Sequence, residues 1–171
     1  SEQLTRLSEL VDYQLQRAAT EGQSSLQSPI SLGEITTKIV NSLEKVYQSK
    51  QIHQKCEIDY NLFIHADEGD MYELLGNLLE NAYKYCSSEI SISIKAKSKM
   101  LEIRIDDDGN GIPEHAQNDI IKRGKRIDSQ IEGHGIGLAI VSDITDAYHG
   151  KITIESSHLG GARFILLLPI Q

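Results

Sequence analysis

The chain has 171 residues, of which 17 are Lys or Arg and 25 are Asp or Glu, so its formal net charge is −8 at pH 7. This balance argues against a general binder of nucleic acid or of anionic membranes, because such proteins carry a surplus of basic charge. Any anionic ligand must therefore meet a local basic cluster. Hydrophobic residues make up 39% of the chain, enough for the core of one ordinary domain. No apolar run approaches the roughly 18 residues of a membrane span, so we expect no direct membrane contact.

The N-terminal third predicts two helices and a strand. Residues 1–20 carry leucines at helical spacing, and after Pro29 the pair Ser31 and Glu34 fits a capping box that opens a second helix. Residues 51–64 alternate apolar and polar side chains, which predicts a strand.

The rest of the chain mixes strands with helices. Asp67 is a plausible N-cap for a central helix that ends near Cys86. A glycine-rich, polar stretch without sustained periodicity predicts a long mobile loop over 109–137. The remaining expected elements are strands at 89–97, 100–107, 151–156 and 162–169 and a helix at 137–148. This order predicts an α+β fold in which one helical layer covers a mixed sheet.

The central helix carries two stripes. An apolar stripe is formed by Leu75, Leu78, Leu79 and Ala82. A second, polar stripe is formed by Asn77, Asn81, Lys84 and Tyr85. Amide oxygens can hold a hard cation and a lysine can meet a phosphate, so this stripe suits a phosphate ligand with its metal. The alternative is an ordinary amphipathic helix with an incidental pair of asparagines.

Residues 106–111, with the sequence Asp-Asp-Asp-Gly-Asn-Gly, follow the end of an expected strand. Three adjacent carboxylates repel one another, so at least one should have a specific partner. An ionised Asp only accepts hydrogen bonds, which suits it to an exocyclic amine such as that of adenine. A polar turn explains the motif equally well when it is taken alone. An EF-hand calcium loop is set aside, because its Glu at the twelfth position is missing.

Residues 133–138, Gly-His-Gly-Ile-Gly-Leu, run directly into a helix. Backbone N–H groups at such a helix start form a phosphate site. The stretch lacks the ending of a P-loop and the context of a dinucleotide fingerprint. For His134, an exposed or phosphate-facing side chain is favoured over a zinc site, because no second ligand is nearby.

Residues 122–126, Lys-Arg-Gly-Lys-Arg, form the only basic cluster of this acidic chain. They are either a solvated loop or charge that follows a polyphosphate when the loop closes. Neither a Ser-His-Asp nor a Cys-His constellation has support in the sequence.

The polar stripe of the central helix and the two glycine-containing stretches resemble three motifs of the catalytic ATP-binding domain of sensor histidine kinases. These motifs are the N box (77–85) and the two glycine boxes (107–111 and 133–138). The resemblance covers about residues 28–170. It implies a Bergerat-type two-layer α/β sandwich with a long ATP lid, shared with DNA gyrase B, the mismatch-repair protein MutL and the heat-shock chaperone ATPases. It also implies three segments: 1–22 as the end of a dimerisation and phosphoacceptor helix, 23–27 as linker, and 28–171 as the catalytic domain.

The resemblance also implies residue roles. Asn77 and Asn81 would hold Mg²⁺ with the phosphates, Lys84 would contact a phosphate, Tyr85 would lie by the nucleotide, and Asp107 would accept from the adenine amine. The other residues implied to contact ATP are Gly109, Gly111, Ile112, Lys125, Arg126, Gly133, His134, Gly135, Ile136, Gly137 and Leu138. Arg126 would sit over the triphosphate and, with Asn77, Asn81 and Lys84, form the catalytic set.

Three features depart from the usual pattern of these kinases. Ile120 and Ile121 stand where a phenylalanine is usual, and His134 and Ile131 stand where Gln and Arg are expected. None of the six histidines is followed by the acidic residue and proline of a phosphoacceptor box. The acceptor histidine should therefore belong to another domain.

The resemblance implies a cytoplasmic domain of a bacterial inner-membrane sensor. Its partners would be ATP, the phosphoacceptor helix of the same protein in a homodimer, and a response regulator. Alternatives are a gyrase-type ATPase, disfavoured because Asn77 stands where a Glu base is needed, and an anti-sigma serine kinase, disfavoured by residues 1–20. A non-enzymatic interaction module with a degenerate nucleotide site is also possible; the intact asparagines, Asp107 and glycines oppose it.

Overall fold

The computed structural model describes residues 28–124 and 135–170. The helix predicted over residues 1–20 and the linker after it lie outside these residues, so both stay predictions. Within the described part of the chain, no helix is both long and apolar enough to cross a bilayer.

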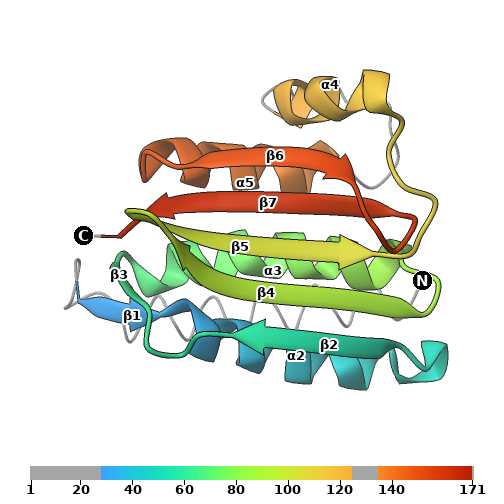
Figure 1. Ribbon diagram of the computed structural model, residues 1–171, viewed down its shortest axis with the longest axis horizontal. Helices are drawn as coiled ribbons and strands as arrows, with labels where there is room; N and C mark the ends of the chain where they lie inside the picture. Colours follow the sequence, from blue (N-terminus) through green and yellow to red (C-terminus); the bar gives the residue numbers. More distant parts are fainter. Residues whose placement is uncertain (1–27, 125–134, 171) are drawn as a thin grey trace.

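A five-stranded mixed sheet forms one layer of the domain (Figure 1). Its strands, in spatial order, are β2 (His53–Ile58), β4 (Glu89–Lys97), β5 (Met100–Asp107), β7 (Ala162–Pro169) and β6 (Lys151–Ser156). The first pair is parallel and the other three pairs are antiparallel. The last four of these strands begin and end where the sequence predicted.

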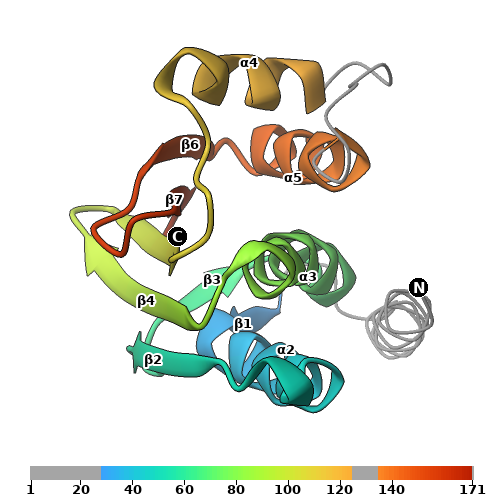
Figure 2. The same cartoon turned by 90° about the vertical axis from the view of Figure 1, so that its right-hand side faces the viewer.

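Three helices cover one face of this sheet: α2 (Leu32–Val46), α3 (Glu68–Tyr85) and α5 (Gly135–Ala147). Figure 2 shows α2, α3 and α5 one above another on the right-hand side of the strands, with no described helix over the opposite face. The predicted two-layer α+β sandwich is therefore confirmed.

Local signals in the sequence fix the starts of two helices. The hydroxyl of Ser31 accepts a hydrogen bond from the backbone N–H of Glu34 at 3.2 Å, and the carboxylate of Asp67 accepts one from Asp70 N–H at 2.9 Å. Each bond satisfies a backbone donor that a helix start leaves without an internal acceptor. Both predicted N-caps are confirmed.

The core lies between the sheet and the helices. The alternating isoleucines Ile90, Ile92 and Ile94 of β4 are at most 1% exposed, and they face the apolar stripe of α3. Because successive strand side chains point to opposite faces, the intervening residues of β4 and β5 lie on the open face. This alternation decides which of the three adjacent aspartates reaches the helical side.

The stretch 109–137 is not one long loop. Helix α4 (Glu114–Gly124) lies within it, beyond β6 and beside α5 (Figure 1). Pro113 precedes the helix, and Gln117 and Ile120, three residues apart, are both buried. This short amphipathic pattern was too weak to detect among the polar residues, so the prediction of a structureless loop was wrong here.

The strand predicted over 51–64 was also wrong in part. Strand β2 ends at Ile58, and after a turn the chain enters β3 (Phe63–His65), which pairs with β1 (Pro29–Ser31) in a separate two-stranded sheet. Tyr60, which falls within the predicted strand, lies in the turn and is 50% exposed.

Candidate functional site

The polar stripe of α3 meets the start of α5. Asn77 and Asn81 are half-buried, one helical turn apart. The side-chain Nδ2 of Asn77 donates to the backbone oxygen of Glu73 at 2.7 Å. This bond turns its Oδ1 toward α5, where a methyl group placed on Gly137 would lie only 3.0 Å from that oxygen. The N box and the second glycine box are thus in contact, as the predicted site requires.

The C-terminal end of α3 adjoins the first glycine box. Lys84 and Tyr85 are half-buried there, with Lys84 Nζ 5.3 Å from the centroid of the Tyr85 ring. A methyl group on Gly109 would collide with the backbone oxygen of Tyr85. Only a glycine allows this close approach of two backbones.

Lys50 caps this end of the helix, a role that the sequence did not indicate. Its Nζ donates to the backbone oxygens of Tyr83, Lys84 and Cys86 at 2.8, 3.1 and 2.8 Å. A cation at a helix C-terminus is stabilising because unpaired carbonyls and the helix dipole place negative charge there. Lys50 comes from the 3₁₀ helix η1 (Gln48–Lys50) that follows α2.

Asp107 is held by two backbone donors. It is only 5% exposed, and its Oδ1 accepts from Gly109 N–H at 2.9 Å and from Ala162 N–H at 3.2 Å. Among the described residues, Oδ2 accepts no hydrogen bond. Burial raises the pKa of Asp107, an effect that these two backbone hydrogen bonds oppose without cancelling. The arrangement is an anchored carboxylate with one oxygen free to accept from a ligand amine.

The two neighbouring aspartates have partners of their own. Asp108 accepts from the backbone N–H groups of Ser87 and Ser88 at 2.8 and 3.0 Å. Burial raises the pKa of Asp108, but these and related hydrogen bonds outweigh it and bring the pKa below its ordinary value. Asp106 pairs with Arg163, whose Nε lies 2.7 Å away. The expectation that at least one of the three adjacent carboxylates has a specific partner is confirmed, and in the structure all three have one.

The rest of the first glycine box turns away from the sheet edge. Gly111 has φ of +71° and lies against the backbone of Gly161. A positive φ favours glycine, which explains the residue at this position. The backbone oxygen of Ile112, which is half-buried, accepts from Gln117 Nε2 at 2.9 Å and so connects the box to α4.

The second glycine box is described only in part. Helix α5 begins at Gly135, two residues earlier than expected, and Leu138 is 2% exposed in the core. Gly135 and Ile136 belong to this helix. The predicted contacts Lys125, Arg126, Gly133 and His134 lie outside the described residues, as does Ile131.

The turn between β6 and β7 belongs to the site although no role was assigned to it from the sequence. It brings Gly161 and Ala162 against Asp107, and the backbone N–H of Gly161 donates to Asp107 O at 3.1 Å. Two consecutive glycines, Gly160 and Gly161, are typical of a turn, but no sequence rule links that turn to an aspartate more than fifty residues earlier.

The amide oxygens fit a magnesium ion only in part. Asn77 presents Oδ1 because its Nδ2 is already engaged, and an amide oxygen is a ligand that Mg²⁺ accepts. The part of the chain that the structure describes holds no group of three or more His, Cys, Asp or Glu suited to a metal. The remaining ligands would have to be phosphate oxygens and water, which is how Mg²⁺ is commonly bound beside a nucleotide.

Comparison with known proteins identifies the family. Residues 66–171 match the family of histidine kinase-, DNA gyrase B-, and HSP90-like ATPases. The two-component sensor PhoQ of Pseudomonas aeruginosa is 35% identical over 162 residues, covering 95% of this chain and 36% of that protein. The virulence sensor histidine kinase PhoQ of Salmonella typhimurium is 36% identical over 174 residues, covering 99% of this chain and 35% of that protein. The chain thus spans about a third of the length of these curated relatives.

Solved structures agree with the fold. The catalytic domain of histidine kinase ThkA superposes with a TM-score of 0.74 at 24% identity, covering 84% of this chain and 95% of that one. The ATP-binding domain of PrrB from Mycobacterium tuberculosis gives 0.70 at 22% identity, covering 86% and 99%. The sequence match over most of the sandwich shows that the chain belongs to the family of histidine kinase-, DNA gyrase B- and HSP90-like ATPases, with sensor histidine kinases among its relatives.

Proposed function

We propose that residues 28–171 are the catalytic domain of a sensor histidine kinase, which binds Mg-ATP and donates its γ-phosphoryl group to a histidine of a phosphoacceptor domain. The observation that carries this proposal is the convergence of three motifs along α3. Gly137 meets Asn77 in the middle of the helix, and Gly109 meets Tyr85 at its end. A nucleotide bound along this helix would meet an acceptor for its adenine amine at the C-terminal end of the helix and amide ligands for a cation nearer its middle.

The adenine base belongs at the end marked by Asp107. Its free Oδ2 accepts from the exocyclic amine, while Tyr85 lies beside the base and Gly109 and Gly111 allow the close approach. A carboxylate with one anchored oxygen keeps a fixed direction for the other, which favours a purine with an amine at position 6.

The phosphates belong along the polar stripe. Asn77 and Asn81 hold Mg²⁺ through their amide oxygens, and Lys84 meets a phosphate as a point charge. The ion supplies neutralisation of the charge that builds up on the phosphoryl oxygens during transfer. The second glycine box, with Gly133, Gly135, Gly137 and the residues between them, would offer backbone N–H groups to the same phosphates. Lys125 and Arg126 add charge from the lid.

Phosphoryl transfer asks little covalent chemistry of these residues. A ring nitrogen of the acceptor histidine attacks the γ-phosphorus, the bond to the β,γ-bridging oxygen breaks, and ADP leaves. Alignment and charge neutralisation carry such a reaction. Asn77 is a poor base for activating water, so transfer is favoured over hydrolysis.

The wider setting follows from the relatives. The acceptor histidine would lie in the dimerisation and phosphoacceptor domain, in a homodimer of the full protein. Residues 1–22 would form the end of a helix of that domain, joined to the catalytic domain through linker 23–27. A response regulator would take the phosphoryl group next. The domain would lie on the cytoplasmic side of a bacterial inner-membrane sensor. The names of the PhoQ relatives, a two-component sensor and a sensor histidine kinase, support the phosphorelay part of this proposal.

A phosphotransfer assay tests the proposal. The chain is incubated with ATP labelled in the γ-phosphate, with and without a separately supplied phosphoacceptor domain from a PhoQ relative. We expect acid-labile label on the acceptor, dependent on Mg²⁺, and little free phosphate without it. Rapid phosphate release without acceptor would identify a hydrolase instead. No label and no release, with ATP bound, would contradict catalysis.

A further inference from the structure

Asp106 is a buried carboxylate on the open face of the sheet, next to the residue that faces the nucleotide. It is 4% exposed, and its Oδ1 accepts from Arg163 Nε and from Ser157 Oγ, both at 2.7 Å. Arg163 Nη2 also donates to Nδ1 of His158 at 2.9 Å. The side chain of Asp107, the next residue of β5, points to the opposite face of the sheet. The side chains of these two consecutive residues therefore lie on opposite faces of the sheet.

Ser157 organises the turn that runs from β6 to β7. Its backbone N–H donates to the backbone oxygen of Gly161 at 2.8 Å, and its backbone oxygen accepts from Gly160 N–H at 3.0 Å. Its hydroxyl oxygen accepts from Leu159 N–H at 3.1 Å. The same hydroxyl donates to Asp106. One serine thus joins the turn to the strand that carries the site.

The far end of that turn holds Asp107. Gly161 N–H donates to the backbone oxygen of Asp107 at 3.1 Å, and Ala162 N–H donates to its Oδ1 at 3.2 Å. The fit leaves no room, because a methyl group on Gly161 would collide with that Oδ1. Any displacement of the turn must therefore move the carboxylate or break its anchor.

We propose that Arg163 and Ser157 are positioning residues, which fix the β6–β7 turn through Asp106 and so direct the free oxygen of Asp107 at the 6-amino group of the purine. The inference rests on the proposed function, because it requires Asp107 to be the base acceptor. Hydrogen bonds weaken steeply when their geometry is lost. A turn that shifts would therefore reduce selectivity for the amine before it reduces binding of the phosphates.

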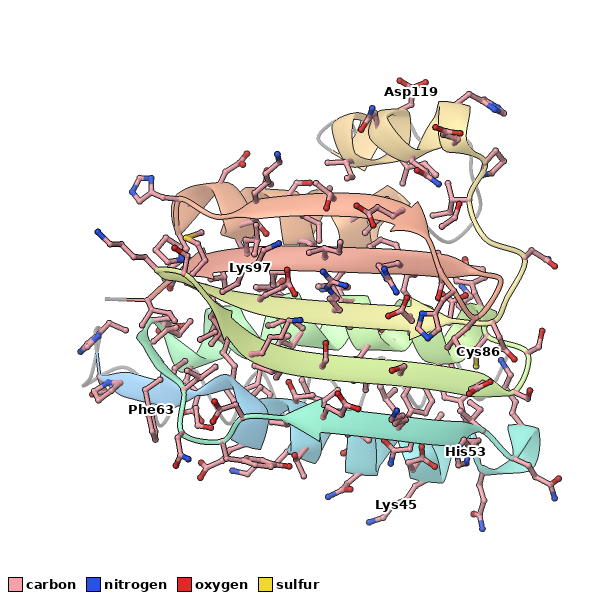
Figure 3. All side chains as sticks on the ribbon, in the orientation of Figure 1. Lys45, His53, Phe63, Cys86, Lys97 and Asp119 are labelled. Carbon is pink, nitrogen blue, oxygen red and sulfur yellow. The ribbon has the colours of Figure 1, made fainter. Side chains whose placement is uncertain are left out.

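A second network on the same strand provides a matched control. Glu102 is 1% exposed on the open face and accepts from Arg104 Nε at 2.8 Å, with Lys97 Nζ 3.3 Å away. Figure 3 shows Lys97 and Cys86, which marks the end of α3, toward opposite ends of the sheet. Arg104 and Arg163 thus each donate to a buried carboxylate of β5, but only Arg163 lies beside the turn that holds Asp107.

The experiment compares two ligands on the full chain by calorimetry. ATP carries the 6-amino group, and purine riboside triphosphate lacks it but keeps the ring, sugar and phosphates. A hydrogen bond to a charged acceptor predicts that the wild type prefers ATP by about 10-fold or more. Arg163→Gln and Ser157→Ala should lower this preference at least about threefold, with affinity for the analogue kept within about twofold. Arg104→Gln should leave the preference unchanged.

Conservative and milder variants keep the test decisive. If Arg163→Gln does not fold because Asp106 loses its charge partner, Ser157→Ala and Arg163→Lys carry the comparison. Arg163→Lys should keep part of the preference, since the charge stays while the Nε geometry is lost. Equal losses for both ligands, or an unchanged ratio in both Arg163→Lys and Ser157→Ala, would overturn the positioning role.

The two levels of the proposal fail in different ways. If the wild type binds neither ligand, the proposed function is wrong. If it binds both ligands equally, the base-acceptor role of Asp107 is wrong and the positioning role is overturned with it. If the wild type prefers ATP and the variants keep that preference, only the positioning role is overturned.

Discussion

The two ends of the proposed nucleotide site are built differently. At the base end, Asp107 is fixed by backbone N–H groups from Gly109 and from Ala162, on two separate segments. At the phosphate end, the described contacts are a side-chain amide on α3, Asn77, against a glycine of α5. The base end is thus preorganised by backbone, whereas the phosphate end depends on side chains and on the ligand itself.

A substitution that disrupts the phosphate end should have the largest effect on nucleotide binding. Asn81→Ala removes one of two amide ligands, and we expect affinity for Mg-ATP to fall by about 100-fold because contacts to charged groups are lost. The increase in affinity that Mg²⁺ gives should largely disappear. Calorimetry with and without Mg²⁺ measures both.

Asn41→Ala is the matched control, since Asn41 is exposed on α2. It should leave both affinities as in the wild type. If Asn81→Ala bound Mg-ATP with wild-type affinity, the nucleotide would not bind along α3 as proposed.

Breaking the base end should have the next largest effect. Gly161→Ala places a methyl group against both the Oδ1 and the backbone oxygen of Asp107. We expect affinity for ATP to fall at least about 10-fold and the free energy of unfolding to fall by about 1–3 kcal/mol, because the crowded backbone must shift. Calorimetry and chemical denaturation test the two effects.

Gly160→Ala separates the collision from a general disturbance of the turn. Gly160 has φ of +103°, but a methyl group there would meet nothing within 4 Å. It should cost about 1 kcal/mol of stability through backbone strain and affect ATP binding much less. Equal losses of affinity in both variants would argue that the turn acts only through stability.

Lys50 offers a test of how the end of α3 is held. Lys50→Met removes three hydrogen bonds to backbone oxygens of this helix end, and we expect the free energy of unfolding to fall by about 2–3 kcal/mol. Affinity for ATP should fall only a few fold, since Lys50 supports Lys84 and Tyr85 without contacting the ligand.

Lys45→Met is its control, because Lys45 is exposed on α2 and points away from the domain (Figure 3). Thermal unfolding of both variants gives the comparison. A Lys50→Met variant as stable as Lys45→Met would show that the cap contributes nothing measurable.

The smallest expected effect is a gain of stability at the base end. Burial raises the pKa of Asp107, so its ionised form opposes folding at neutral pH. Asp107→Asn should leave the free chain as stable as the wild type or more stable by up to about 1 kcal/mol at pH 7. It should lose the preference for ATP over the analogue without a 6-amino group, because an amide N–H would face the amine.

The pH dependence gives the sign of this effect. Because the pKa of Asp107 is raised in the folded state, its protonated form stabilises the fold at pH values below the ordinary carboxyl pKa. This contribution is lost as the pH rises through the raised pKa. Any advantage of Asp107→Asn should therefore shrink as pH falls into the acid range. Unfolding curves at several pH values check this, and an advantage that grew on acidification would contradict the assignment.

Much of the fold could be predicted because its signals are local. The caps at Ser31 and Asp67 and the alternation in β4 each depend on residues a few positions apart. Helix α4 was missed because only a few residues of its short sequence face the core. Strand β1 was missed because three residues paired with a distant strand carry no periodic signal.

In the candidate site, too, local features could be predicted from the sequence and long-range contacts could not. Asp107 and the asparagines stand in compact motifs, so their residue types suggested an amine acceptor and a cation site. Lys50 and Ser157 could not be predicted, because each acts on a segment far away in the sequence. Their roles depend on which strands are neighbours, and only the three-dimensional structure shows that.

We propose that a nucleotide binds along α3 with its base at Asp107 and its phosphates at the asparagines. Titration calorimetry of the full chain with ATP, in the presence and absence of Mg²⁺, tests it most directly. If the nucleotide binds in this way, its affinity should rise when Mg²⁺ is present. No binding at millimolar ATP would contradict it and would favour an interaction module whose nucleotide site has degenerated.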